Sequence, residues 1–273
     1  MKMLSGDLEF LGEISKEAGK AILEVYETNF TVERKTDSSP LTLADRRSHQ
    51  LISARLQSEY PQIPVLSEEG KDVPYAVRKA WPRFWLVDPL DGTKEFIKRN
   101  GEFSVNIALV EGNIPTIGAI YLPVPDRLFL ADIRKECLEI CHGETRRLQA
   151  GIASAAGTIR VLKSRSHPSS ELEALLEVLP SHESITRGSA LKFCAIAAGE
   201  ADFYPRFGPT WEWDTAAGQA ILTAAGGVMV TLNGDPFTYN KPSLVNGPFL
   251  AAGSLTWLKQ SGIFERAGSV AGK

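Results

Sequence analysis

The chain has 273 residues, of which 43% are hydrophobic and 23% charged, as is typical of a globular protein with one large or two small domains. Its formal charge of −3 provides no cationic field for binding a long nucleic acid, so we exclude that partner class. Three cysteines, Cys137, Cys141 and Cys194, are too few for a disulfide framework and favour a reducing compartment. Cys137, Cys141 and His142 lie close in sequence, but no second ligand pair follows them at zinc-site spacing, so we expect no zinc site.

The sequence shows no segment typical of export or of a membrane span. Asp7, Glu9 and Glu13 interrupt the apolar run that a signal peptide would need. The longest weakly polar stretch, residues 220–230, is about half the length of a transmembrane helix. We therefore expect a cytoplasmic protein without a transmembrane segment, whereas peripheral membrane association and the oligomeric state stay open.

Two amphipathic helices are expected to precede the first strand. Apolar residues recur at spacings of three and four from Leu8 to Tyr26, and the same spacing returns from Ala44 to Tyr60. The apolar run 84–87 predicts a buried strand that ends at Asp88-Pro89, because proline cannot donate to a sheet. An antiparallel meander is the simplest arrangement for the strands that we expect next, over residues 103–110, 116–121 and 127–131.

Small residues from 149 to 157 are typical of a domain junction. We therefore expect an N-terminal α+β domain over residues 1–150 and a C-terminal α/β domain over residues 151–273. The second half is expected to be α/β because strand-like and helix-like segments alternate there, over residues 158–162, 171–178, 189–198, 201–204, 215–225 and 228–231. The tail from 268 to 273 consists mostly of small residues and is expected to fray.

Acidic residues stand at four places where the chain is expected to leave regular structure. Carboxylates beside apolar elements cost desolvation energy unless a cation compensates, and Mg²⁺ prefers oxygen ligands. A shared metal site would account for all of them, although each one also fits a simpler role as a helix cap, a turn or a solvated loop. The residues concerned are Asp45, Glu68-Glu69, Asp88 with Asp91, and Asp214.

The segment Asp88-Pro89-Leu90-Asp91-Gly92-Thr93 combines features of a metal site and a phosphate site. Asp88 and Asp91 are three residues apart, so a turn can direct both at one centre, and the Leu90 carbonyl adds a third oxygen. Glycine lets the backbone approach a ligand closely, and successive N–H groups at such a turn can bind phosphate oxygens. We therefore expect the metal and the phosphate to share this loop.

These motifs, followed by Trp213-Asp214-Thr215-Ala216-Ala217-Gly218, resemble the lithium-sensitive, magnesium-dependent phosphatase superfamily of inositol monophosphatase and fructose-1,6-bisphosphatase. The resemblance implies a layered αβαβα sandwich of mixed α+β and α/β type. It also implies two or three Mg²⁺ ions and direct attack by a metal-activated water without a phosphoenzyme. Asp45 and Thr93 would form the general base, Glu68 would also take part in catalysis, and the metal ligands would be Glu68, Asp88, the Leu90 carbonyl, Asp91 and Asp214.

A narrower resemblance, to 3′(2′),5′-bisphosphate nucleotidases of the CysQ type, is carried by residues 88–96, 164–167, 188–194 and 201–218 and extends over about residues 7–255. The chain departs at Ala190, where the bacterial nucleotidases usually have serine. The resemblance implies hydrolysis of adenosine 3′,5′-bisphosphate to AMP and phosphate in sulfur assimilation and nucleotide recycling, with the 5′-phosphosulfate analogue as a further candidate substrate. The implied substrate contacts are Asp91, Gly92, Thr93, Ser164, His167, Gly188, Ser189, Lys192, Arg206 and Asp214.

Two alternatives stay open at this point. An inositol or sugar phosphatase would use the same metal ligands with different contacts around residues 164–167 and 188–206. A non-catalytic phosphate-binding regulatory module would keep only the fold. The presence of both Asp45 and Thr93 beside the full ligand set favours an enzyme.

Overall fold

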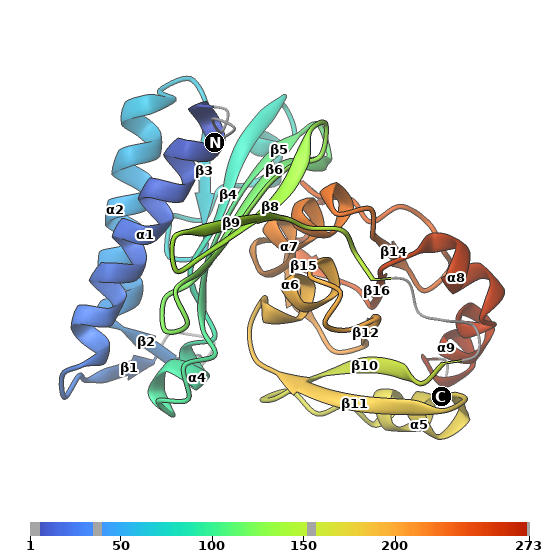
Figure 1. Cartoon of the computed structure of the whole chain (residues 1–273). Coiled ribbons are helices and arrows are strands. Elements are labelled where there is room, and N and C mark those ends of the chain that lie inside the picture. The colour runs from blue at the N-terminus through green and yellow to red at the C-terminus, as the bar shows by residue number, and fades with distance from the viewer. Residues whose placement is uncertain (1–5, 35–39, 152–156, 272–273) are drawn as a thin grey trace.

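The helices and strands stack in five layers, in the order helices, sheet, helices, sheet, helices (Figure 1). The computed structural model describes residues 6–34, 40–151 and 157–271. One sheet has seven strands and the other has five. This is the αβαβα sandwich expected from the sequence, so the expectation about the fold class is confirmed.

The first layer consists of the two long helices α1 (Gly6–Tyr26) and α2 (Leu43–Glu59), as the spacing of apolar residues predicted. Leu11, Ile14 and Ile22 of α1 are fully buried in the cluster between these helices and the first sheet. Their burial follows from the three-to-four-residue spacing, which brings apolar side chains to one face of a helix.

The seven-stranded sheet has the strand order β3-β4-β5-β6-β7-β8-β9. β3 and β4 are parallel and every other neighbouring pair is antiparallel, so the predicted meander is confirmed and two further strands, β8 and β9, extend it. Helices cover both faces, which explains why the central strands are buried along almost their whole length. The strands are β3 (Val65–Ser67), β4 (Arg83–Asp91), β5 (Ser104–Glu111), β6 (Ile114–Leu122), β7 (Arg127–Asp132), β8 (Glu136–Cys141) and β9 (Glu144–Arg147).

Strand β4 does not end at Asp88-Pro89, and the prediction of its end was wrong. The strand continues to Asp91, and its register with β5 shifts between Asp88 and Asp91. Pro89 lies inside this irregularity, where its missing N–H costs no regular sheet hydrogen bond. The irregularity places Asp88, Leu90 and Asp91 at the very end of a buried strand, which fixes their positions more firmly than a free loop would.

The third layer consists of α6 (Leu191–Ala197) and α7 (Glu212–Ala224), which lie between the two sheets. α7 approaches β6 closely at Gly118, where an added Cβ would lie 2.8 Å from the Ala217 carbonyl oxygen. The five-stranded sheet follows, with the order β11-β10-β12-β16-β14 and both parallel and antiparallel pairs. Its strands are β10 (Ile159–Ser164), β11 (His182–Arg187), β12 (Phe203–Arg206), β14 (Val228–Thr231) and β16 (Phe249–Ala252).

The outer helices α5 (Ser170–Val178), α8 (Leu255–Gln260) and α9 (Ile263–Ala271) cover the far face of the second sheet. α9 includes residues 268–271 and buries Val270, so the prediction of a frayed tail was wrong for this part. No helix within the described ranges is long and apolar enough to cross a membrane. The remaining short elements are β1 (Val32–Arg34), β2 (Pro40–Thr42), β13 (Thr210–Trp211), β15 (Val245–Asn246), α3 (Tyr75–Arg78) and α4 (Thr93–Ile97).

The first sheet ends at Arg147 and the second begins at Ile159. The predicted domain junction at 149–157 falls between them, and its residues 152–156 lie outside the described part of the chain. One hydrophobic cluster nevertheless joins the two halves, with members such as Phe129 from the first sheet and Phe193 from α6. The division into residues 1–150 and 151–273 therefore stays a prediction about organisation, because the halves share a core.

Candidate active site

One pocket brings together the predicted site residues that the motifs spread over the sequence. Each of them except Asp45 lines this pocket, and Asp45 contacts it through Thr93. Most of the lining comes from the ends of β4 and β10, from α4, α6, β12 and the start of α7, and from the segments that follow β3, β10 and β11. Residues from both halves of the chain therefore form a single site.

Five carboxylates line the pocket: Glu95 and the four predicted metal ligands Glu68, Asp88, Asp91 and Asp214. The pKa of Asp88 is raised well above its usual value, chiefly by burial. The charges of Glu68, Asp91 and Asp214 and a hydrogen bond with Glu68 raise it further. The pKa of Asp214 is likewise raised, chiefly by burial and then by the charges of Asp91 and Glu68. The four groups therefore lie close enough to repel one another, as carboxylates do when no cation compensates for their charges.

The backbone at the end of β4 is fixed by short hydrogen bonds. The Leu90 N–H donates to Asp88 Oδ1 at 3.1 Å, and the Ser48 hydroxyl of α2 donates to the Pro89 carbonyl at 2.7 Å. Gly92 follows with φ 92°, a conformation that favours glycine, and an added Cβ would lie 3.0 Å from the Glu102 carbonyl oxygen. The backbone of the turn thus requires the glycine of the Asp-Gly-Thr sequence.

The set of carboxylates fits a divalent cation in charge and in donor type. Carboxylate oxygens and the Leu90 carbonyl are ligands that Mg²⁺ prefers, and a cation would relieve their mutual repulsion. Within the described residues, no three His, Cys, Asp or Glu side chains are arranged to bind one ion by themselves. Asp91 and Asp214 instead accept hydrogen bonds from Ser189 at 2.7 Å and from the Trp211 N–H at 2.8 Å.

The two members of the predicted Glu68-Glu69 pair lie in different surroundings. Glu68 lines the pocket, whereas Glu69 is not part of the lining. The charge of Glu69 adds to the burial that raises the pKa of Asp45. Burial lowers the pKa of His49, and the charge of Glu69 only partly opposes this effect. Of this pair, the metal ligands predicted from the sequence include Glu68 and not Glu69, and this choice stays a prediction.

Asp45 and Thr93, 48 residues apart in sequence, are in contact. The Thr93 hydroxyl lies 3.2 Å from Asp45 Oδ1 and 3.3 Å from the Leu90 carbonyl, so it can donate to either acceptor. Asp45 Oδ2 accepts from the N–H and the hydroxyl of Thr42, the N-cap of α2. Asp45 therefore has one oxygen in a capping box and the other directed at Thr93. Burial raises the pKa of Asp45, although the hydrogen bonds from Thr42 oppose this effect.

Asp91 belongs to a polar chain that the sequence did not reveal. Ser189 donates to Asp91 Oδ2 at 2.7 Å, and Asn106 donates to the same oxygen at 3.3 Å. Ser104 lies 2.6 Å from the Ser189 hydroxyl and donates to Asn106 at 2.8 Å. Ser104 and Asn106 are buried polar residues in strand β5, and two polar residues at alternate positions of an otherwise apolar strand are the signal that could have identified them.

The predicted cationic contacts lie in the pocket but are already bonded to the protein. Lys192 donates to the Ser189 carbonyl at 2.6 Å, and burial lowers the pKa of Lys192 to about 8. Arg206 donates to the carbonyls of Gly208 and Pro209, both at 3.0 Å. His167, which lines the pocket, lies 3.3 Å from Lys94 Nζ. Lys94 was not among the predicted contacts, although it follows the Gly92-Thr93 turn directly.

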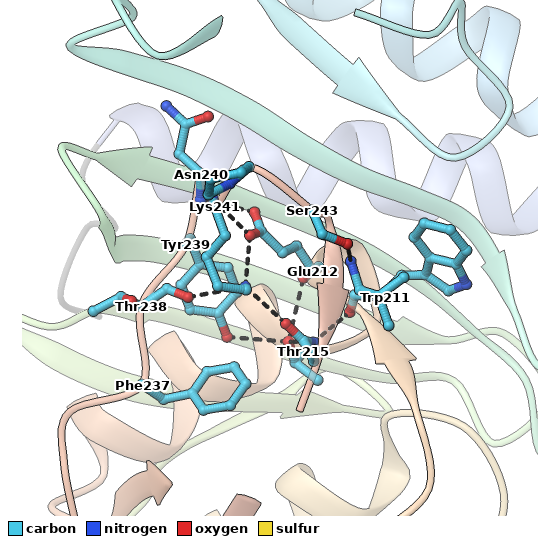
Figure 2. A network of polar contacts seen from close by, with 12 residues as sticks. Trp211, Glu212, Thr215, Phe237, Thr238, Tyr239, Asn240, Lys241 and Ser243 are labelled. Atoms are coloured by element: carbon cyan, nitrogen blue, oxygen red, sulfur yellow. Dashed lines mark hydrogen bonds and ion pairs between the residues drawn. The ribbon is translucent and has the colours of Figure 1, made fainter. Parts of the chain in front are cut away.

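The start of α7 is held by a buried polar network (Figure 2). Glu212 is completely buried and accepts from Lys241 Nζ at 2.6 Å and from the backbone N–H groups of Asn240 and Lys241. Asn246 donates to the Trp211 carbonyl at 2.8 Å and to the Thr215 hydroxyl at 3.0 Å. These contacts bracket Asp214 on both sides, so the network fixes the turn of helix that carries this carboxylate.

Comparison with known proteins gives consistent results. The model of the inositol monophosphatase family matches residues 4–266. The chain is 46% identical over 245 residues to the 3′(2′),5′-bisphosphate nucleotidase CysQ of Salmonella typhimurium, covering 89% of this chain and 98% of the relative. It is 44% identical to the protein of the same name from Escherichia coli K12 over 246 residues, with the same coverage.

Solved structures agree with this assignment. CysQ from Bacteroides thetaiotaomicron, described as a bacterial member of the inositol monophosphatase family, is 39% identical and superposes with a TM-score of 0.78 over 91% of this chain and 97% of that one. An inositol monophosphatase from Thermotoga maritima shares the fold at 20% identity, with a TM-score of 0.80 over 98% of this chain and 99% of that one. The chain therefore belongs to the inositol monophosphatase family.

Proposed function

We propose that the chain is a magnesium-dependent phosphomonoesterase that hydrolyses adenosine 3′,5′-bisphosphate to AMP and phosphate, acting in sulfur assimilation and nucleotide recycling. The observation that carries the proposal is the single pocket in which four carboxylates, the Asp45–Thr93 contact and the side chains of Lys192 and Arg206 meet. The names of the CysQ relatives support the choice of substrate. The proposal extends to the 5′-phosphosulfate analogue, which carries the same 3′-phosphate.

The metal ligands in this proposal are Glu68, Asp88, the Leu90 carbonyl, Asp91 and Asp214. Mg²⁺ bound there would supply charge neutralisation and a more acidic water. The raised pKa values of Asp88 and Asp214 support the assignment, because crowded buried carboxylates favour a cation among them. Lithium is expected to inhibit by competing for one of these positions.

Thr93 and Asp45 would move the proton of the attacking water. Asp45 Oδ1 accepts the proton of the Thr93 hydroxyl, and the Thr93 oxygen can then accept the proton of the water. A bond forms between the water oxygen and phosphorus, the bond from phosphorus to the 3′-oxygen breaks, and that oxygen takes up a proton. Glu68, which lines the same pocket, would help to orient the water.

The remaining predicted contacts would position the substrate. The N–H groups of Gly92 and Thr93 would face the oxygens of the reacting phosphate, where fixed dipoles oppose negative charge without reorganising. Ser164, His167, Lys192 and Arg206, with Gly188 and Ser189, would contact the second phosphate and the ribose. A bisphosphate needs such charge-assisted hydrogen bonds in addition to the metal site.

Phosphate release from a panel of substrates tests the proposal. Adenosine 3′,5′-bisphosphate, inositol 1-phosphate and fructose 1,6-bisphosphate are compared in Mg²⁺, with and without a chelator. We expect the nucleotide to have the highest kcat/KM and the chelator to abolish turnover. A preference for inositol 1-phosphate or the sugar would overturn the choice of substrate, and no Mg²⁺-dependent hydrolysis of any substrate would overturn the enzymatic proposal.

A further inference from the structure

The pocket offers an aromatic surface that neither the metal chemistry nor the phosphate contacts use. Trp211, the N-cap of α7, lines the pocket, and 41% of its surface is exposed. Among the exposed large hydrophobic side chains of the described residues, Trp211 alone belongs to the lining. Single exposed apolar residues are ordinary on protein surfaces, so the position of this one in the pocket is what requires an explanation.

Trp211 is held as a rigid platform. Its ring stacks on that of Trp213, with ring centres 5.1 Å apart and planes within 6° of parallel. The backbone N–H of Trp211 donates to Asp214 at 2.8 Å, and the backbone carbonyl of Trp211 accepts from Asn246 at 2.8 Å. Figure 2 shows the indole pointing away from the buried network that fixes its backbone. A ligand that stacks on this ring would therefore lose little free energy to the ordering of the protein.

The other aromatic residues of the pocket do not offer such a surface. Phe193 and Tyr204 line the pocket, but both are almost completely buried. Lys192 Nζ already lies 5.2 Å from the centre of the Tyr204 ring. Apart from the imidazole of His167, which we assign to the phosphate and ribose side, Trp211 is therefore the aromatic side chain of the described pocket that is available to a ligand.

The lining of the pocket thus combines carboxylates, cationic side chains and an exposed indole ring, which correspond to the three parts of a nucleoside bisphosphate. Asp88 and Asp91 lie where the metal and the reacting phosphate would bind, whereas Lys192 and Arg206 supply positive charge for a second phosphate. The indole of Trp211 suits a flat aromatic base, because base–aromatic stacking is worth about 1–3 kcal/mol per base. A nucleoside bisphosphate carries all three groups, whereas inositol and sugar phosphates carry no ring to stack.

We propose that Trp211 is a specificity-determining residue on which the base of the nucleotide stacks. This inference rests on the proposed nucleotidase function and adds a contact to it. Stacking on a ring remote from the reacting phosphorus stabilises the bound substrate and the transition state equally. Trp211 is therefore expected to act on KM for nucleotides, and to do so for any base, since every base has an aromatic face.

The test compares adenosine 3′,5′-bisphosphate with an abasic ribose 3,5-bisphosphate in the wild-type protein and in Trp211→Ala, Trp211→Leu and Trp211→Phe. We expect Trp211→Ala and Trp211→Leu to raise KM for the nucleotide about tenfold and to lower the ratio of nucleotide to abasic kcat/KM by the same factor. Trp211→Phe should retain most of this ratio. Tyr75→Ala, which truncates an exposed aromatic residue outside the pocket, is the matched control and should leave the ratio unchanged.

Each other outcome has a distinct meaning. An equal loss on both substrates in Trp211→Ala and Trp211→Leu would overturn the proposal, because it would indicate a structural role. An unchanged ratio in both variants would also overturn it, since the base would then bind elsewhere. If the wild-type protein hydrolyses neither bisphosphate, the proposed nucleotidase function fails and the stacking proposal fails with it. Thermal melting of each variant establishes that the protein compared is folded.

Discussion

Asp91 combines two tasks at the end of strand β4. It accepts hydrogen bonds from Ser189 and Asn106, and its charge acts on both Asp88 and Asp214. An asparagine at this position would keep an oxygen acceptor for Ser189 while removing the negative charge. The hydrogen bonds and the charge can therefore be separated by one substitution that changes almost no volume.

We expect Asp91→Asn to lower kcat/KM for adenosine 3′,5′-bisphosphate by at least about 100-fold, because charge compensation for the metal is worth several kcal/mol in the transition state. The melting temperature should change little, since the side-chain volume is retained. Steady-state kinetics and thermal melting measure the two effects. Asp235→Asn, at an exposed residue outside the pocket, is the control. Activity close to the wild-type value in Asp91→Asn would remove this residue from the metal site.

His167 is expected to remain neutral at physiological pH. Partial burial, followed by the positive charges of Arg206 and Lys94, lowers the pKa of His167 to about 4 from its ordinary value of 6.5. Lys94 Nζ lies 3.3 Å from Nε2 and can only donate, so Nε2 accepts and the ring is uncharged.

The pH dependence of stability tests this protonation state. Between about pH 6.5 and 4 the unfolded chain binds a proton at His167 that the folded chain does not, so the native state loses stability as the pH falls through this window. Urea unfolding at pH 7.5 and pH 5 should show a larger loss for the wild-type protein than for His167→Gln. An NMR titration should give a midpoint for His167 near 4, and a midpoint near 6.5 would contradict the expectation.

The site residues that could be predicted are those whose chemistry is conspicuous in sequence. The motif carboxylates and Thr93 meet in one pocket, and the sequence indicated this because several acids beside apolar elements need a shared cation to compensate for their desolvation. Ser104, Asn106 and Trp211 were not identified in this way. The alternation of polar residues in β5 marks Ser104 and Asn106 as unusual, but the contact of Ser104 with Ser189, 85 residues away, and the exposure of Trp211 are not visible in local composition.

At the scale of elements, α7 depends on a buried ion pair for its position. Glu212 is fully buried, and Lys241 Nζ, 2.6 Å from it, also donates to Asn246 at 3.0 Å (Figure 2). Asn246 in turn holds residues on both sides of Asp214. Removing one partner of a buried pair leaves an uncompensated charge, which costs far more than replacing both.

We expect Lys241→Met to lower the free energy of unfolding by about 3 kcal/mol and the double variant Glu212→Gln/Lys241→Met to recover part of this loss. Urea unfolding measures both. Arg46→Met, which removes an exposed pair with Glu33 at 2.5 Å, is the control and should cost less than about 1 kcal/mol. A loss in Lys241→Met no greater than in the control would show that the buried pair does not stabilise the start of α7.

Elements with a clear periodic pattern were predictable, and short or irregular ones were not. α1, α2 and the strands β5 to β7 follow the expected ranges closely because their burial is regular. β11 escaped prediction because it is a largely exposed edge strand without an apolar run. The end of β4 was misplaced because a proline normally ends a strand, and only the register shift beside it allows the strand to continue.

For the whole molecule, the domain boundary predicted at residue 150 separates the two sheets, but it does not describe the contacts that join them. Glu102, just before β5 of the first sheet, accepts from Arg165 Nε and Nη2 at 2.5 and 2.7 Å and from the Gly188 N–H at 2.7 Å. Arg165 follows β10 of the second sheet, and Gly188 precedes the Ser189 that contacts Asp91. Glu102 thus connects the two halves directly beside the pocket, a contact that no local pattern in the sequence indicates.

This connection should be sensitive to pH. Burial alone would raise the pKa of Glu102, but the hydrogen bonds from Arg165 and Gly188 outweigh it and lower the pKa below its ordinary value of 4.5. The folded state therefore binds fewer protons than the unfolded state in the acidic range. The resulting stabilisation is fully present above about pH 4.5 and is lost as the pH falls through the lowered folded-state pKa.

We expect Glu102→Gln to lower the free energy of unfolding by about 1 kcal/mol at pH 7, a modest value because Arg165 is 39% exposed and water screens the pair. The difference from the wild-type protein should shrink as the pH falls below about 4.5 and through the lowered folded-state pKa of Glu102, because the carboxylate of the wild-type protein then also becomes neutral. Urea unfolding across this range measures it, with the exposed Glu177→Gln as control. A difference that stays constant with pH would mean that shape, not charge, joins the two halves at this point.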